Sequence, residues 1–251
     1  MNMAHWFKCQ KGVSVLTVVL IMSILSIIGA VFVSFFTTGV EVLTGEVGSG
    51  RALFIADGAA EAAMGRLNAS PASTNWLWSS GYLNKTIGGG TANVEVLQHD
   101  PYPSQTTASP YCIAITPQLL NTGANPARTI LASVKWDPSV NPADLGVELY
   151  NADLVGLGTC ATPGALPVAS SVTSNNPETI RYRIPEPGSF PATVTYTVRV
   201  VGNAGGAHSL AVSYPDKPGF STTNDARAVI SAGKSGNARR EIFVSFRRQP
   251  C

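Results

Sequence analysis

The chain has 251 residues, of which 45% are hydrophobic and 13% are charged. It is therefore too apolar for a disordered protein and long enough for a substantial core. The formal net charge of +2, without a basic stripe, argues against a nucleic-acid-binding protein. The three histidines stand in no metal-ligand or nucleophile motif, so we expect no metal, no cofactor and no enzymatic activity.

The N-terminal region indicates a membrane helix. Residues 1–12 form a polar leader that contains Lys8 and Lys11, and no acidic residue occurs before position 41. Residues 13–40 contain no charged residue, histidine or proline. At about 1.5 Å per residue this run exceeds the roughly 30 Å of a hydrocarbon core. The positive-inside rule then places the N-terminus in the cytoplasm and the body outside it.

Two plainer interpretations of this apolar run exist. A secretory signal peptide has a shorter apolar region that ends in a small-residue cleavage site, and the length of residues 13–40 argues against it. An uncleaved single-pass anchor stays open as an alternative.

The helical pattern continues beyond the membrane run. Residues of one helix face recur at spacings of three and four: Leu53, Ala56, Ala60, Ala63 and Leu67. This is the period of an amphipathic helix, and Pro71 is a natural stop. We expect a helix over residues 13–70, ending near 69, either continuous or interrupted at the glycines of positions 45–50.

The period then changes to that of strands. Residues 91–98 and 111–117 alternate and predict a hairpin, with a Pro/Ser loop between its strands. Residues 227–248 predict two strands around a turn at 233–237. We expect residues 71–126 and 216–251 to form an α+β head, with an antiparallel sheet packed on the helix.

Residues 127–215 form a distinct block. Alternation is clear at 134–136, 147–150 and 193–201, and Pro, Gly and Asn turns separate the segments. Short strands at such spacing predict a β-sandwich inserted in the head.

Four cysteines occur, and none stands in a C-x-x-C pair. Cys9 lies in the leader, which leaves Cys112, Cys160 and Cys251 in the body. Outside the cytoplasm they fit one disulfide and one free thiol, and the sequence leaves three pairings open. We favour Cys112 with Cys251, because both flank the inserted block.

Two further signals have plain explanations. The "GKS" of residues 233–235 lacks the first glycine of a phosphate-binding loop, since Ala228 stands there, and a hairpin turn explains it better. Four carboxylates could gather around calcium, but they lack a calcium-loop pattern and are expected to be solvated: Asp137, Asp144, Glu148 and Asp153.

The sequence from the end of the leader to the end of the predicted helix carries a family resemblance. "KGVSVLTVVLIMSILSIIGA", followed by "ALFIADGAAEAAMGRL", resembles the N-terminal region of PilX-type minor pilins of type IV pili. The match covers about residues 8–68. It implies that prepilin peptidase cleaves between Gly12 and Val13, and that Val13 becomes the N-methylated first residue.

The resemblance also gives Thr17 a meaning. It would occupy the fifth mature position, where major pilins carry a glutamate that is thought to pair with a neighbour's N-terminal amine. Inserting a carboxylate into lipid costs about 2.5 kcal/mol or more. A subunit with Thr17 avoids this cost while it lies in the bilayer, but it offers no carboxylate to a neighbour's N-terminal amine. This departure implies a minor, initiating or tip-proximal subunit. The plain alternative is a neutral residue in an anchor.

The inserted block resembles the bacterial pre-peptidase C-terminal (PPC-like) sandwich. The matching segments are "ADLGVELYNAD", "NNPETIRYRIPEPGSF" and "YTVRVVGNAGGAHSLAV". The resemblance implies an accessory binding or stabilising module, although the spacing around Asp144 and Tyr150 departs slightly from the family's pattern.

We therefore expect a non-catalytic minor pilin that acts in pilus assembly, initiation or tip function, with adhesion as a role for the sandwich. Its expected partners are other minor and major pilins, prepilin peptidase and the inner membrane, but no nucleic acid. The protein would sit in the inner membrane with a periplasmic body, and later in the pilus or on the cell surface. The alternatives are a tip-class pseudopilin of a type II secretion system and a single-pass anchored surface binding protein.

Overall fold

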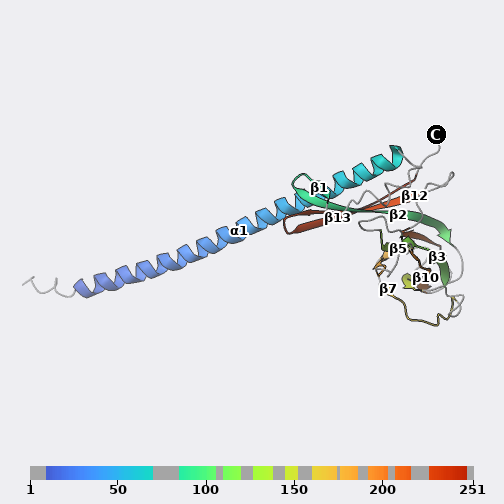
Figure 1. Cartoon of the computed structure of the whole chain (residues 1–251). Helices are drawn as coiled ribbons and strands as arrows, with labels where there is room; N and C mark the ends of the chain where they lie inside the picture. Colours follow the sequence, from blue (N-terminus) through green and yellow to red (C-terminus); the bar gives the residue numbers. More distant parts are fainter. Residues whose placement is uncertain are drawn as a thin grey trace, which may run out of the picture. The chain divides into compact units, whose positions relative to one another are not determined.

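The fold was analysed in a computed structural model of the chain. It describes residues 10–69, 85–105, 110–119, 127–137, 145–151, 160–173, 176–185, 192–202, 207–215 and 226–247. Two compact units are present, Met1–Gly50 and Arg51–Cys251. The chain combines one long helix with antiparallel sheets that include a β-sandwich (Figure 1), so the expected α+β class is confirmed.

The helix α1 runs from Gln10 to Ala69. It is continuous, so the glycines at positions 45–50 do not interrupt it. One segment of the described chain, Val15–Leu67, is long and apolar enough to cross a membrane. The weak helix propensity of these glycines, about 1 kcal/mol each, is therefore not enough to end so long a helix.

The described strands form two main sheets and a small ribbon. A seven-stranded sheet has the order β13-β12-β2-β11-β5-β8, with β1 also paired to β2, and a four-stranded sheet has the order β3-β10-β6-β7. Strands β4 and β9 pair with each other. The bounds are β1 Lys85–Ile87, β2 Gly90–Gln105, β3 Tyr111–Ile115, β4 Gln118–Leu119, β5 Thr129–Trp136, β6 Leu145–Tyr150, β7 Ala169–Ser171, β8 Glu178–Arg183, β9 Ala192–Thr193, β10 Tyr196–Gly202, β11 His208–Tyr214, β12 Ala226–Ser235 and β13 Ala238–Arg247.

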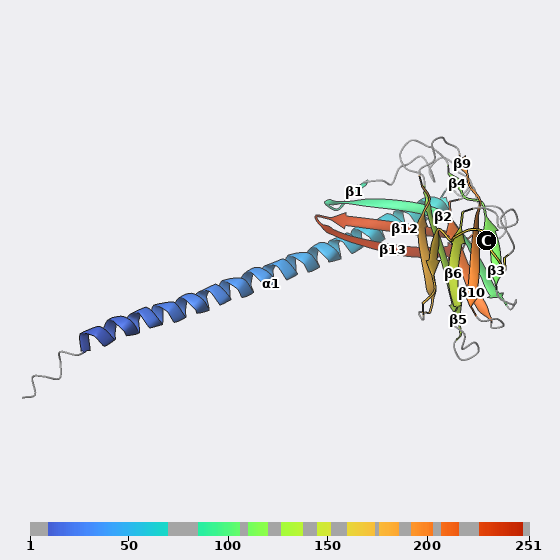
Figure 2. The same cartoon turned by 90° about the horizontal axis from the view of Figure 1, so that it is seen from below.

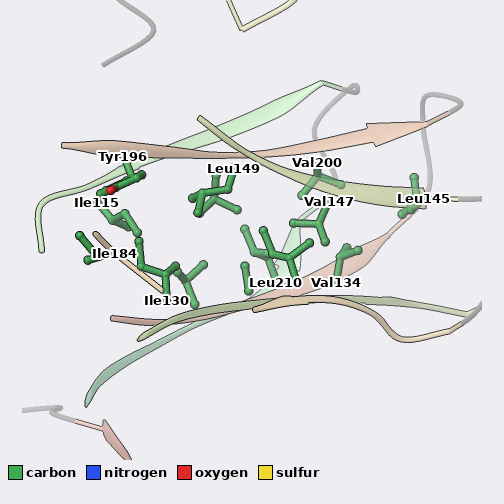
Figure 3. Packing of buried hydrophobic residues seen from close by; sticks show 14 of the residues in the cluster. Ile115, Ile130, Val134, Leu145, Val147, Leu149, Ile184, Tyr196, Val200 and Leu210 are labelled. Carbon is green, nitrogen blue, oxygen red and sulfur yellow. The ribbon is translucent and has the colours of Figure 1, made fainter. Parts of the chain in front are cut away.

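The largest core lies between the two main sheets. Figure 3 shows inward-facing side chains of both sheets meeting there, among them Leu149 and Val200 opposite Ile130 and Leu210. Alternating residues of β10 and β5 point into this core because strand side chains alternate between faces. The alternation at 134–136 and 147–150 therefore predicted strands correctly, and that at 193–201 did so from Tyr196 on, where β10 begins.

Strand β2 is shared by the helix-packed part of the sheet and the sandwich. It pairs with β12 from Thr91 to His99 and with β11 from Gln98 to Gln105. Because β2 side chains alternate, the face that carries Val94 and Val96 toward the helix continues onto the face of β11 that lines the sandwich core. One sheet face thus contacts the helix in one part and the second sheet in another.

The seven-stranded sheet is strongly curled. Its edge strands β8 and β13 are joined by an ion pair between Arg181 and Glu241. On the same side, Ala127 and Leu131 pack against Ile230 of β12. Figure 2 shows β12 and β13 running steeply across the direction of β5. Right-handed strand twist accumulated over the sheet produces this curl.

The predicted hairpin between residues 91–98 and 111–117 is wrong. Strand β3 pairs with β10 in the four-stranded sheet, with Cys112 opposite Arg199. Strand β2 continues to Gln105 and pairs with β11 instead. By contrast, the two C-terminal strands predicted over residues 227–248 are confirmed as β12 and β13.

Candidate functional site

The most unusual surface is the apolar part of α1. Every large hydrophobic side chain from Val15 to Phe36 is between 48% and 75% exposed. No described part of the chain covers them, whereas soluble proteins rarely leave large contiguous apolar patches open. This surface, which we call the apolar helix surface, requires lipid or another protein around it.

The few hydroxyl groups in this segment are compatible with such surroundings. Ser23 donates to the carbonyl oxygen of Val19 at 2.9 Å, and Ser26 donates to that of Met22 at 2.8 Å. Further along, Thr37 Oγ1 lies 3.0 Å from the carbonyl oxygen of Val33. Hydroxyls that bond one turn back need no water, so these residues do not oppose an apolar environment.

The residues singled out by the resemblance lie on this helix. Gly12 and Val13 fall in the first turn of α1, and Thr17 is exposed one turn later. Thr17 therefore belongs to the apolar helix surface, and the first acidic residue of the chain, Glu41, lies well beyond it.

The second half of the helix is packed on the sheet instead. Four residues of the predicted face are buried as expected, but Leu53 is 46% exposed and was assigned to the wrong face. The buried helix face consists of Ala52, Ile55, Ala56, Ala59, Ala60, Ala63 and Leu67. Alanine on this face allows helix and sheet to approach closely.

The closest approach involves two small residues of β12. The Ser231 hydroxyl donates to the carbonyl oxygen of Ala56 at 2.6 Å. A Cβ atom added at Gly233 would lie 2.1 Å from the carbonyl oxygen of Ala52 and 2.6 Å from the amide nitrogen of Ala56. Gly233 thus has a packing role within the strand, and the turn occurs three residues later, at Gly236 with φ +58°.

On the sandwich, the structure joins Cys112 to Cys160. Our preference for Cys112 with Cys251 was therefore wrong, and Cys251 lies outside the described residues. The two bonded cysteines meet beside β10, not at the ends of the inserted block. Cys112 lies on β3 beside β10, and the segment containing Cys160 crosses over β10.

Arg199 of β10 holds that segment in place. Its guanidinium donates through Nε to the carbonyl oxygen of Cys160 at 2.8 Å and through Nη2 to that of Ala161 at 3.1 Å. Its Nη1 pairs with Glu148 at 2.8 Å, and Tyr150 donates to the same carboxylate oxygen at 2.8 Å. Burial, followed by the bond to Glu148, raises the pKa of Tyr150. No local sequence pattern links the members of this group, so the sequence alone did not predict it.

Glu148 is one of the four carboxylates considered above for calcium binding. Its carboxylate is engaged by Arg199 and Tyr150. Asp144 and Asp153 lie outside the described residues. Within the described ranges no three metal-ligating side chains come together.

His99 occupies the point where β2 pairs with both β11 and β12. Its Nδ1 lies 2.8 Å from the Ser213 hydroxyl, and its ring meets Phe243 edge-on at 6.3 Å between centroids. Burial lowers the pKa of His99, while the nearby Asp100 acts in the opposite direction. Because Ser213 is buried, this pair does not form an accessible nucleophile.

Comparison with models of known protein families and with curated proteins finds no match for this chain.

Proposed function

We propose that this protein is a non-catalytic filament subunit of the minor pilin kind. The observation that supports this best is the division of α1 into an exposed apolar surface and an alanine-rich face buried on the sheet. A plain anchor requires only the first. In this chain the same helix also supplies the alanine-rich face on which the sheet packs.

The proposed mechanism is an exchange of apolar surroundings. In the inner membrane, acyl chains cover the apolar helix surface. In a filament, the helices of neighbouring pilins replace them. Small residues such as Gly29, Ala30 and Ser34 allow helix backbones to pack closely where lipid tails offer no hydrophobic driving force.

Thr17 supports a minor or tip-proximal place in such a filament. It has no charge to form an ion pair with a neighbouring subunit's N-terminal amine, and it has no charged form to desolvate in the bilayer. A subunit of this kind suits initiation better than repeated addition along the filament. The disulfide-bonded sandwich would be its outward module, with adhesion as the proposed role.

The proposal is tested by locating the protein in cells of its own source that make filaments. We expect wild-type protein in both membranes and sheared filaments, and Gly12→Ala protein only in membranes, as a longer uncut form detected by immunoblot. A Gly58→Ala variant, changed the same way on the exposed side of α1, should behave as wild type. Equal filament levels of Gly12→Ala, or wild-type protein that never leaves the membrane, would contradict the proposal.

A further inference from the structure

The C-terminal strand β13 is an open sheet edge of unusual length. It pairs with β12 through ten residue pairs without a register shift, and it pairs with no other described strand. Figure 2 shows it alongside β12 on the side away from β2. The other edge strands of the two main sheets are shorter: β8 has six residues, β3 five and β7 three.

The turn geometry shows which backbone groups face outward. Ser235 and Ala238 flank a two-residue turn, and such a flanking pair exchanges both of its hydrogen bonds. Hydrogen-bonded pairs then alternate along the ladder. The free N–H and C=O groups therefore belong to the alternate residues 239, 241, 243, 245 and 247.

The side chains of β13 favour pairing with a further strand. Its centre reads Ile242, Phe243, Val244, Ser245 and Phe246, none of which is buried. Phe243 is 48% exposed on the face opposite the helix, where the His99 ring supports it. A long, apolar edge of high β-propensity, without proline or bulge, is a template for another strand.

Charge indicates what kind of strand fits. Arg239 and Arg240 stand at one end of β13 and Arg247 at the other, against the single acidic residue Glu241. The Arg239 side chain is 67% exposed although its Nη2 lies 3.8 Å from Glu241. Glu241 also pairs with Arg181 of β8, so this one carboxylate is shared by two arginines and a positive excess is left. A second copy of β13 would double this positive excess, whereas an acidic strand would neutralise it.

We propose that β13 binds an extended acidic segment of a partner protein by β-strand addition. The partner strand pairs with the outward backbone groups of alternate residues, places an apolar side chain against Phe243 and brings carboxylates to the arginines at the ends. This interaction does not depend on the role proposed for α1.

The test uses the full chain in detergent micelles and a synthetic peptide with alternating valine and threonine and an aspartate at each end. Hydrogen exchange measured by mass spectrometry should slow at least about tenfold across residues 239–247 when the peptide is added. A version with proline at two alternate positions cannot pair along the edge, and it should give no protection.

Variants of the protein test whether the peptide binds at the outer edge of β13. Ser245→Pro removes one outward N–H but no bond to β12, and we expect it to weaken binding about tenfold or more with the disulfide intact. Arg239→Gln should weaken binding. Arg183→Gln, the same change on the exposed edge strand β8, should leave it unaltered.

Absence of protection, equal protection by the proline peptide, or a Ser245→Pro variant that binds normally would overturn the proposal. Protection of β13 without peptide that grows with protein concentration would identify a second copy as the occupant, and would also overturn it.

Discussion

The Ser231 hydroxyl donates a 2.6 Å hydrogen bond to the carbonyl oxygen of Ala56, and both residues are buried. This bond joins strand β12 to the N-terminal helix, 175 positions apart in the chain. It forms where Ala52 and Ala56 of the helix lie against Ser231 and Gly233 of the strand, so the two backbones come within reach of each other. The contact holds the sheet on the helix segment that follows Gly50.

Gly233→Ala should disrupt this contact. The new methyl group would overlap the backbone of Ala52 and Ala56, at 2.1 and 2.6 Å, and backbone cannot rotate aside as a side chain can. We expect a loss of about 3 kcal/mol in the free energy of unfolding, at the upper end of overpacking effects, measured by urea denaturation in micelles.

Gly58→Ala is the matched control, because nothing lies within 4 Å of the added Cβ. It should be neutral or stabilising by up to about 1 kcal/mol through helix propensity. Equal stability of the Gly233→Ala and Gly58→Ala proteins would contradict the close approach of β12 to the helix backbone at Gly233.

The disulfide gives a second prediction. Cys112–Cys160 closes a loop with a sequence separation of 48, and the loss of such a loop constraint costs about 2–4 kcal/mol. Cys160→Ser should lower stability by this amount, while Cys251→Ser should not remove the bond. Peptide mapping without reductant should find Cys112 linked to Cys160, and a Cys112–Cys251 peptide would contradict the structure.

The third prediction compares two arginine–glutamate pairs. Arg199 is 15% exposed and serves three acceptors, whereas Arg181 is 45% exposed in its pair with Glu241. Arg199→Lys cannot reproduce the planar fork and should lose about 2 kcal/mol. Arg181→Lys should lose less than about 1 kcal/mol. Thermal unfolding of both variants decides the point, and losses of equal size would contradict the role given to Arg199.

The fourth prediction concerns pH. Burial holds the pKa of His99 below its ordinary value of 6.5, so the unfolded chain takes up this proton before the folded chain does. Stability should therefore decrease as the pH falls below about 6.5. His99→Gln removes this component. The difference in unfolding free energy between the two proteins should be constant above pH 7 and change below pH 6.5. A constant difference throughout would contradict the buried environment of His99.

Local pattern predicted the helix and most strands, but not how the strands pair. The prolines between residues 98 and 111 predicted a loop, yet β2 runs through Pro101. In the β12 ladder the odd-numbered residues of β2 point their N–H groups toward β12. That pairing ends at His99, so an N–H at position 101 would have no strand partner on that side. Proline therefore costs little there.

The features of the candidate site likewise divide into those that local sequence predicts and those that depend on distant contacts. The apolar helix surface follows from composition alone, because a long uncharged run needs no tertiary information. The alanine face was predicted in part, and Leu53 was misplaced because a period of three or four fits neighbouring helix faces almost equally. Arg199, Ser231 and the disulfide depend on contacts between distant segments, and neither alternation nor spacing encodes these contacts.

The central claim is that the apolar helix is a processed pilin helix, and the mass of the native N-terminus tests it most directly. Protein purified from cells of its own source should begin at Val13 with an N-methyl group, as determined by mass spectrometry of its N-terminal peptide. An intact peptide that spans Lys11, Gly12 and Val13 would contradict the claim and leave a plain membrane anchor.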